Sequence, residues 1–244
     1  MTRIAFLLAA VLAAFSGVAI SAEAPRIAII IDDLGYQLAA GRRAIALPGP
    51  VSFAILPGAP RTHLLATSAT ESGKEVLLHL PMQASIDDDI VEPVTLTLDM
   101  SRSDFAETFD AAIAAVPSAV GISNHRGGLI TRHPGHMQWL MEEIHARDTL
   151  FFIDSYTTHE SVALQLAAET GVDAIKRDVF LDTDPAPDTI RREFERLKLL
   201  ARQRGAAVGI GHPYATTLAF LEAELPKLAE QGFKLVTISE LVTN

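Results

Sequence analysis

Short runs of branched apolar residues recur along the chain and alternate with longer segments in which apolar positions follow helical spacing. The short runs suit strands that are covered on both faces. We predict strands at Ile27–Ile31, Val51–Ile55, Glu75–His79, Val120–Ser123, Leu150–Ile153, Asp173–Ile175, Ala207–Ile210 and Lys234–Thr237. We predict helices at Tyr36–Leu47, Arg61–Ser72, Arg102–Val116, Gly135–Arg147, Ser161–Thr170, Asp188–Arg204 and Ala215–Gln231. This order predicts a mostly parallel sheet, either closed into a (β/α) barrel or open and doubly wound.

The segment between Pro81 and Asp99 departs from this alternation. It contains two prolines and three consecutive aspartates, Asp87 to Asp89. We therefore predict a long loop here, with a short edge strand at Val94–Leu98. Long loops in compact domains often carry function, although the acidic triplet by itself is typical of a solvated turn.

The first 22 residues have the three parts of a secretory signal peptide: a basic residue, Arg3, then an apolar stretch, then small residues before the end. An uncleaved membrane anchor is the alternative, because the apolar stretch approaches the ~20 residues that span a bilayer. We expect a periplasmic or secreted protein, with residues 23–26 as a short lead-in and residues 27–244 as a single domain. No other stretch is long and apolar enough to span a bilayer, so no stable span is expected after leader cleavage.

The composition narrows the chemistry available to the chain. The formal net charge is −10, and an acidic surface argues against nucleic acid as a partner. Cysteine is absent, which excludes disulfides, thiolate metal sites and cysteine nucleophiles. The chain also lacks a Gly-x-Ser-x-Gly nucleophile motif and a phosphate-binding glycine loop. Any bound metal must therefore be held by histidine and carboxylate side chains.

Two adjacent aspartates, Asp32 and Asp33, stand where the first predicted strand ends. Neighbouring carboxylates repel each other and are costly to desolvate unless a metal ion, a cation or a shared proton compensates. The pair therefore indicates a functional site. A surface turn or a helix cap is the alternative, because aspartate is favoured at both.

Polar side chains follow several other predicted strands. In parallel α/β folds the site lies at the carboxyl ends of the strands, so these side chains are expected to meet. The full set is Asp32, Asp33, His79, Asn124, His125, Asp154, Arg177, Asp178 and His212. The remaining histidines fall in predicted helices or connectors and are interpreted as bystanders, and Trp139 is interpreted as a core residue.

Three of the strand-end residues form a candidate metal site. Asp33, His79 and His125 offer one carboxylate and two imidazoles, a ligand set that suits Zn²⁺ or a similar divalent ion and leaves a position for water. The neighbouring Asp32 can take the proton from an attacking water. His212 can protonate a leaving group, although a plain turn histidine is the alternative.

The other strand-end residues are assigned supporting roles. Asp154 can orient an imidazole by accepting its second N–H. Arg177 can hold Asp32 ionised or bind an anionic oxygen, and a pairing with its neighbour Asp178 is an equal alternative. Asn124 completes the set.

Five segments of the chain carry a resemblance to a known family. They are Ile30-Ile31-Asp32-Asp33-Leu34-Gly35, Val76-Leu77-Leu78-His79-Leu80-Pro81-Met82, Gly121-Ile122-Ser123-Asn124-His125-Arg126-Gly127-Gly128, Phe152-Ile153-Asp154-Ser155 and Ile210-Gly211-His212-Pro213. Together they resemble the divergent polysaccharide deacetylases, relatives of the carbohydrate esterases with a NodB-type domain. The resemblance covers roughly Arg26 to Val242.

The resemblance implies a distorted (β/α) barrel of the glycoside hydrolase/deacetylase type, with mostly parallel strands. It also implies a metal-dependent site that removes acetyl groups from N-acetylated sugars. In the typical esterases the first aspartate of the pair acts as base and the second binds metal, which implies these roles for Asp32 and Asp33. A late strand-end histidine acts as acid there, which implies that role for His212.

One position departs from the family pattern. The typical metal motif has two histidines four residues apart, whereas the residue at that spacing from His79 is Gln83. We interpret His125 as the replacement ligand.

The leading prediction is a metal-dependent polysaccharide deacetylase that uses Zn²⁺ and acts on N-acetyl groups of envelope or other amino-sugar glycans. Gln83 keeps a second prediction open: a catalytically degenerate barrel that binds glycan or an envelope protein without turnover. A third alternative is another metal-assisted hydrolase, such as a phosphoesterase, that uses the same residues on a different substrate.

Overall fold

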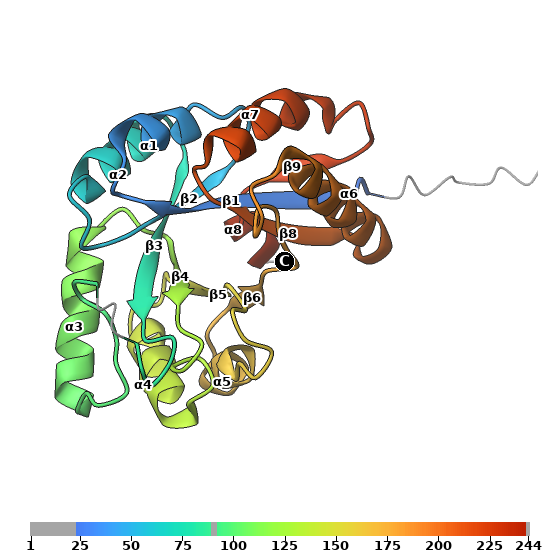
Figure 1. Ribbon diagram of the computed structural model, residues 1–244. Helices are drawn as coiled ribbons and strands as arrows, with labels where there is room; N and C mark the ends of the chain where they lie inside the picture. Colours follow the sequence, from blue (N-terminus) through green and yellow to red (C-terminus); the bar gives the residue numbers. More distant parts are fainter. Residues whose placement is uncertain (1–22, 89–91, 243–244) are drawn as a thin grey trace, which may run out of the picture.

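Parallel strands form one curved sheet in the computed structural model, which describes residues 23–88 and 92–242 (Figure 1). The strands are β1 (Arg26–Leu34), β2 (Ser52–Ile55), β3 (Glu75–Met82), β4 (Gly121–Arg126), β5 (Phe151–Asp154), β6 (Ala174–Lys176), β7 (Val179–Phe180), β8 (Ala206–Gly211) and β9 (Lys234–Val236). Among the described residues their order is β6-β5-β4-β3-β2-β1-β8-β7, with β9 beside β1. The order leaves β6 and β7 unpaired with each other, so the sheet is a distorted (β/α) barrel, as predicted. The predicted leader and Asp89 lie outside the described residues.

Helices alternate with the strands, and all but the last cover the outer face of the sheet (Figure 1). They are α1 (Leu38–Ile45), α2 (Thr62–Glu71), α3 (Arg102–Ala115), α4 (Pro134–His145), α5 (Ala163–Thr170), α6 (Pro187–Arg204), α7 (Ala215–Glu224), the 3-10 turn η1 (Leu225–Lys227) and α8 (Ser239–Val242). None of these helices combines the length and the apolar character needed to cross a membrane.

Local sequence explains where several helices begin and end. α3 begins with a capping box, in which the Ser101 hydroxyl accepts a hydrogen bond from the Asp104 amide and the Asp104 side chain accepts one from the Ser101 amide. α6 is capped at its end by Gly205, whose φ of 84° lies in the left-handed region that favours glycine at this position. The cap is followed at once by β8, so the polypeptide returns directly to the sheet.

β1 lies inside the sheet and is buried along most of its length. It pairs with β8 along one edge, and along the other edge with β9 in its first half and with β2 in its second half. Ile27, Ile29 and Ile31 pack in the apolar core that includes residues of the surrounding helices, whereas Ala28 and Ile30 pack in a second core inside the barrel. All five are fully buried. The prediction of a strand covered on both faces is therefore confirmed. Because side chains alternate along a strand, Asp32 faces the inside of the barrel, as Ala28 and Ile30 do.

Three features differ from the predicted elements. β7 and α8 were not predicted, because runs of two and four residues carry no readable periodicity. The predicted edge strand at Val94–Leu98 is wrong: in the described part of this loop only an isolated bridge joins Leu96 to Met82. The helix predicted to reach Gln231 ends at Glu224, because Pro226 lacks the amide hydrogen that would continue it.

Candidate active site

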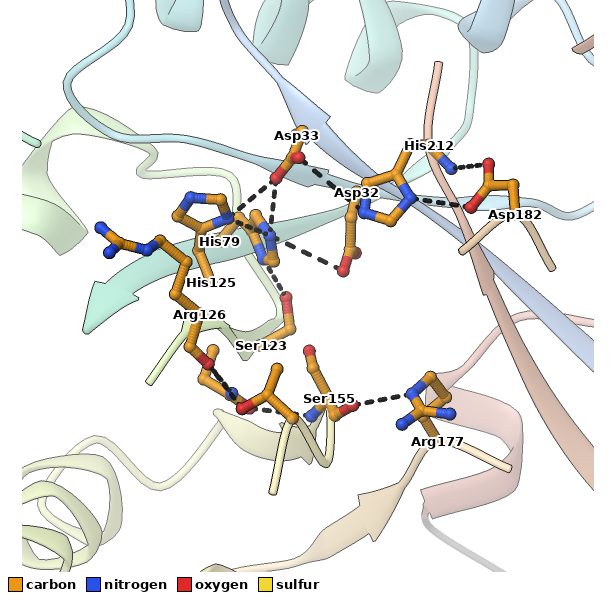
Figure 2. A network of polar contacts seen from close by, with 12 residues as sticks. Asp32, Asp33, His79, Ser123, His125, Arg126, Ser155, Arg177, Asp182 and His212 are labelled. Atoms are coloured by element: carbon orange, nitrogen blue, oxygen red, sulfur yellow. Dashed lines mark hydrogen bonds and ion pairs between the residues drawn. The ribbon is translucent and has the colours of Figure 1, made fainter. Parts of the chain in front are cut away.

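Both aspartates of the opening pair reach the same side of the sheet because β1 is irregular at its end. If side chains simply alternated along the strand, Asp33 would point outward, on the same face as Ile31. The pairing of β1 with β2 shifts register between Ile31 and Leu34, and Asp33 has a φ of 59°, a left-handed conformation that aspartate tolerates better than most residues. This local turn brings the Asp33 carboxylate over the barrel mouth, next to the buried Asp32 (Figure 2).

His79 lies near the end of β3 and is almost completely buried. Its Nδ1 is 2.8 Å from the hydroxyl oxygen of Ser123, the residue paired with it on β4. When Nδ1–H donates to this oxygen, Nε2 keeps its lone pair, and Nε2 lies 3.1 Å from Asp33 Oδ1. The sequence analysis assigned Ser123 no contact. Its true partner follows from the strand register, which the sequence does not display.

His125 comes from the end of β4 and approaches the same point from the other side (Figure 2). Its Nδ1 lies 2.9 Å from Asp33 Oδ1 and 3.2 Å from His79 Nε2. Its other nitrogen, Nε2, lies 3.3 Å from Glu92 Oε2. Glu92 belongs to the long loop after β3 and was missed by the sequence analysis.

Asp33 Oδ1, His79 Nε2 and His125 Nδ1 form a triangle with sides of 2.9, 3.1 and 3.2 Å. Ligand atoms about 2.0–2.1 Å from a tetrahedral zinc ion are separated from one another by about 3.3 Å. Asp33 Oδ1 is buried and is directed at both imidazole nitrogens, as a shared set of ligand atoms requires. The structure therefore brings the three predicted ligands together in an arrangement that fits a divalent metal ion.

Burial and the neighbouring histidines shift the pKa values of the two aspartates in opposite directions. Burial raises the pKa of Asp33, but without a metal ion the hydrogen bonds that His125 and His79 donate when these nitrogens are protonated outweigh burial and hold this pKa well below its usual range. Burial raises the pKa of Asp32, and the attraction of His79 opposes it only in part. Asp33 thus stays ionised as a ligand must, whereas Asp32 has the stronger proton affinity of the two, as a base requires.

His212 follows β8 and is held by an acid that the sequence analysis missed. Its Nδ1 lies 2.8 Å from Asp182 Oδ1, while Asp182 Oδ2 accepts hydrogen bonds from the His212 amide and the Thr217 hydroxyl. Burial lowers the pKa of His212, but the hydrogen bond to Asp182 and its charge outweigh burial and raise the pKa to about 9. His212 Nε2 faces the cluster, 3.8 Å from Asp33 Oδ2. Asp182 escaped notice because it follows the unpredicted strand β7.

Arg177 forms its hydrogen bonds with backbone carbonyl oxygens, and not with the carboxylates that the sequence analysis considered. Its Nε and Nη2 donate to the carbonyl oxygens of Ser155 and Tyr156, and its guanidinium lies 3.7 Å from the ring centre of Phe180. The alternative pairing with Asp178 is not formed: Asp178 accepts hydrogen bonds from Arg204 and the Val208 amide. Arg177 still acts on the buried Asp32 through its charge.

Asp154 and Asn124 form hydrogen bonds with backbone groups and not with histidine rings. The Asp154 oxygens accept hydrogen bonds from the Ser161 hydroxyl and the Tyr156 amide, so the expected contact with an imidazole is not formed. Asn124 Nδ2 donates to the Arg126 carbonyl, and its Oδ1 accepts from the Ser155 amide. Both residues therefore fix the ends of β4 and β5 around the cluster.

Gln83 is not a ligand and has a different task. Its Oε1 accepts a hydrogen bond from the Leu98 amide, and its Nε2 donates to the Ser85 carbonyl. Its backbone amide donates to the Leu96 carbonyl. These bonds attach the long loop to the end of β3.

Two further histidines form a separate pair on α4. His133 is the N-cap of this helix and accepts a hydrogen bond from the His136 amide, and His136 packs against Trp139. Neither belongs to the metal-type cluster that the described residues form.

A cavity of about 540 Å³ opens beside the cluster. Asp33 and His212 line it together with Tyr36 and Tyr214, whose side chains are about half exposed. The Tyr214 ring also lies 5.5 Å from the His212 ring. The volume falls within the ~300–1,000 Å³ typical of ligand sites.

Comparison with other sequences identifies relatives of the whole barrel. A family model described as divergent polysaccharide deacetylase matches residues 29–242. The uncharacterized protein YibQ of Escherichia coli is 40% identical over 199 residues, which cover 82% of this chain and 62% of that protein. An uncharacterized protein of Haemophilus influenzae is 36% identical over 219 residues, which cover 90% and 77%. The match thus spans less than two thirds of the Escherichia coli relative.

Solved structures share the fold at lower identity. An uncharacterized protein from Agrobacterium tumefaciens superposes with a TM-score of 0.86 at 23% identity over 91% of both chains. A family 4 carbohydrate esterase from Streptomyces lividans in complex with acetate gives a TM-score of 0.51 at 16% identity, over 89% of this chain and 94% of that one. A Bacillus anthracis pseudoenzyme of the same esterase family gives 0.51 at 16%, over 90% and 66%.

The structural likenesses show the fold alone, because all three fall below 25% identity. The sequence comparisons go further: the family model spans nearly the whole described chain, and the Haemophilus influenzae relative is matched over most of its length. The resemblance first read from the five segments is therefore confirmed. The chain belongs to the divergent polysaccharide deacetylase family.

Proposed function

We propose that this protein is a metal-dependent deacetylase that hydrolyses N-acetyl groups of amino-sugar glycans. The observation that carries the proposal is the Asp33, His79 and His125 cluster, with Asp32 on one side and His212 on the other. Amide hydrolysis needs an activated water and a proton for the departing amine. The site offers a group for each need.

Asp33, His79 and His125 would hold the metal ion, for which Zn²⁺ is the expected identity. When bound, the ion supplies Lewis-acid polarisation of the amide carbonyl and lowers the pKa of water. Asp32 accepts the proton of the attacking water through its carboxylate, for which its raised pKa suits it. His212 donates the Nε2 proton to the amide nitrogen as the C–N bond breaks, and Asp182 holds its ring while it does so. Acetate and the free amine are the products.

The cavity beside the cluster supports a sugar as the group that carries the amide. Tyr36 and Tyr214 expose ring surface at its lining, and aromatic faces pack well against the apolar faces of pyranose rings. Gln37 and Thr216 add polar groups that can bond to sugar hydroxyls. A periplasmic or secreted location, proposed from the leader-like residues 1–22, would give access to envelope glycans.

The test is acetate release from the N-acetylglucosamine tetramer by the zinc-loaded protein. We expect hydrolysis that is lost in Asp32→Asn and in His125→Ala and retained in His133→Ala, a matched change at a histidine outside the site. Absence of acetate release above the Asp32→Asn level, across tetramers of N-acetylglucosamine and peptidoglycan fragments, would overturn the proposal.

Binding without turnover is the second candidate, because the side chain of Gln83 is committed to the long loop and leaves the metal to only three protein ligands. The same preparations decide between the two. Saturable binding of the tetramer with no acetate release would support the second candidate, and acetate release dependent on His79 and His125 would exclude it.

A further inference from the structure

The long loop after β3 contributes a carboxylate that touches the metal-type cluster from outside. We propose that Glu92 is a positioning residue that holds the His125 ring with Nδ1 turned toward Asp33 and His79, and that Gln83 anchors the loop that carries it. The inference rests on the metal site of the proposed function but not on deacetylation itself.

Glu92 and His125 meet in a shielded position. Glu92 Oε2 lies 3.3 Å from His125 Nε2, and the side chains are 20% and 15% exposed. This oxygen is buried and has no hydrogen-bond partner among the described residues other than the approaching imidazole. A buried carboxylate oxygen without a partner is costly, so the contact with an N–H at Nε2 satisfies both groups.

The contact decides which nitrogen of His125 is available. A neutral imidazole carries one proton, and a hydrogen bond to one nitrogen selects the lone pair on the other. With Nε2–H directed at Glu92, the lone pair of Nδ1 points to the position between Asp33 Oδ1 and His79 Nε2. A carboxylate on the second nitrogen also strengthens the imidazole as a ligand. Ser123 does the same for His79 through the opposite nitrogen, so each histidine has its own orienting partner.

Hydrogen bonds connect the backbone that follows Glu92 to the end of β3. The Glu92 carbonyl accepts hydrogen bonds from the amide and the hydroxyl of Thr95. One residue after Thr95, Leu96 exchanges backbone hydrogen bonds with Pro81 and Gln83 at the end of β3. The Gln83 side chain adds its bond to Leu98. The position of Glu92 is thus tied to β3, the strand that carries His79.

The inference is tested by measuring the zinc affinity of the wild type, Glu92→Ala and Glu92→Gln by competition with a chromophoric chelator. We expect about 10-fold weaker binding in Glu92→Ala, the lower end of losses seen when outer partners of metal-bound histidines are removed. Glu92→Gln keeps an acceptor oxygen and should lose less. Gln83→Ala should weaken binding in the same direction by loosening the loop.

A second readout separates positioning from a merely structural role. In zinc-loaded protein labelled with ¹⁵N at histidine, the proton of His125 should sit on Nε2 and exchange slowly with solvent, and in Glu92→Ala it should exchange fast. Glu107→Ala is the matched control, since it removes the same charge from an exposed position on α3. It should change neither readout.

Three outcomes would overturn the inference: no binding of zinc by the wild-type protein, equal zinc affinity in the wild type and Glu92→Ala, or a metal-bound Nε2 on His125. A protein that binds zinc with the expected dependence on Glu92 but releases no acetate would uphold it while rejecting the proposed reaction. The two proposals therefore fail separately.

Discussion

Three residues at strand ends adopt left-handed backbone conformations although none is glycine. Asp33, Arg126 and Tyr156 have φ values of 59°, 60° and 50°. Such conformations cost roughly 1–3 kcal/mol each and persist where the surroundings over-determine them. Asn124 and Asp154 supply that support by bonding to the backbone of Arg126 and Tyr156. These conformations cluster where the candidate site lies, which agrees with the use of strained backbone to aim functional side chains.

The Asp182–His212 pair gives a prediction at the residue scale. In metal-free protein Asp182→Asn should lower the pKa of His212 from about 9 toward 6.5, because the neutral amide no longer favours the imidazolium. A pKa raised in the folded state means that folded protein binds more protons than unfolded protein between pH 6.5 and 9. Stability from this pair is therefore complete below pH 6.5 and is lost as the pH rises through about 9.

NMR titration of the histidine side chains measures the pKa of His212, and urea unfolding at several pH values measures the stability. Asp178→Asn is the control, because Asp178 pairs with Arg204 away from His212. An unchanged titration of His212 in Asp182→Asn would contradict the prediction.

The turn that leaves β1 shows how one element positions the site. Gly35 has a φ of 141°, and a Cβ placed on it would lie 2.5 Å from the Cβ of Ala59. The Gly35 carbonyl accepts a hydrogen bond from the Arg61 amide, which fixes the turn against the segment before α2. The close approach lets Asp33 and Tyr36, on either side of the turn, both line the cavity.

Gly35→Ala is therefore expected to be costly. The added methyl group would force Ala59 away and would hold a backbone conformation that side chains disfavour. We expect a loss of about 1–3 kcal/mol relative to Gly73→Ala, from overpacking alone. Gly73 is a fair control because it also has a positive φ but has no neighbouring atom within 4 Å of the added group. Urea unfolding of both variants measures the difference, and equal losses would refute it.

At the scale of the whole molecule, the parallel strands bring residues that are far apart along the chain to one end of the barrel. β1, β3 and β4 carry the three cluster residues near their carboxyl ends, and His212 directly follows β8; the parallel strands place these ends on the same side of the sheet. A ligand that bridges Asp33, His79 and His125 therefore ties three strands together. Unfolding would separate its donors.

Zinc should accordingly stabilise the whole fold. A ligand that binds only the folded state at 100 times its Kd adds about 2.7 kcal/mol to the free energy of unfolding. Thermal unfolding with and without zinc measures the gain as a rise in Tm, reversed by a chelator. His125→Ala should abolish most of the rise. An equal rise in that variant would show that zinc binds elsewhere.

Much of this architecture is determined by the sequence itself. The strand and helix periods follow from which residues are apolar, and a parallel sheet places its strand ends together whatever the details of packing. That rule alone was enough to group Asp32, Asp33, His79, His125 and His212. The family resemblance then assigned roles that the residue pattern could not distinguish.

The partners of these residues were decided only by the tertiary structure. Ser123 meets His79 through strand register, Asp182 meets His212 across two neighbouring strands, and Glu92 meets His125 through a loop without periodicity. Contacts of this kind depend on how separate elements pack, and local sequence carries no signal for them. The sequence therefore determines which side chains gather at the barrel mouth, and the packing decides which nitrogen and which oxygen each one presents.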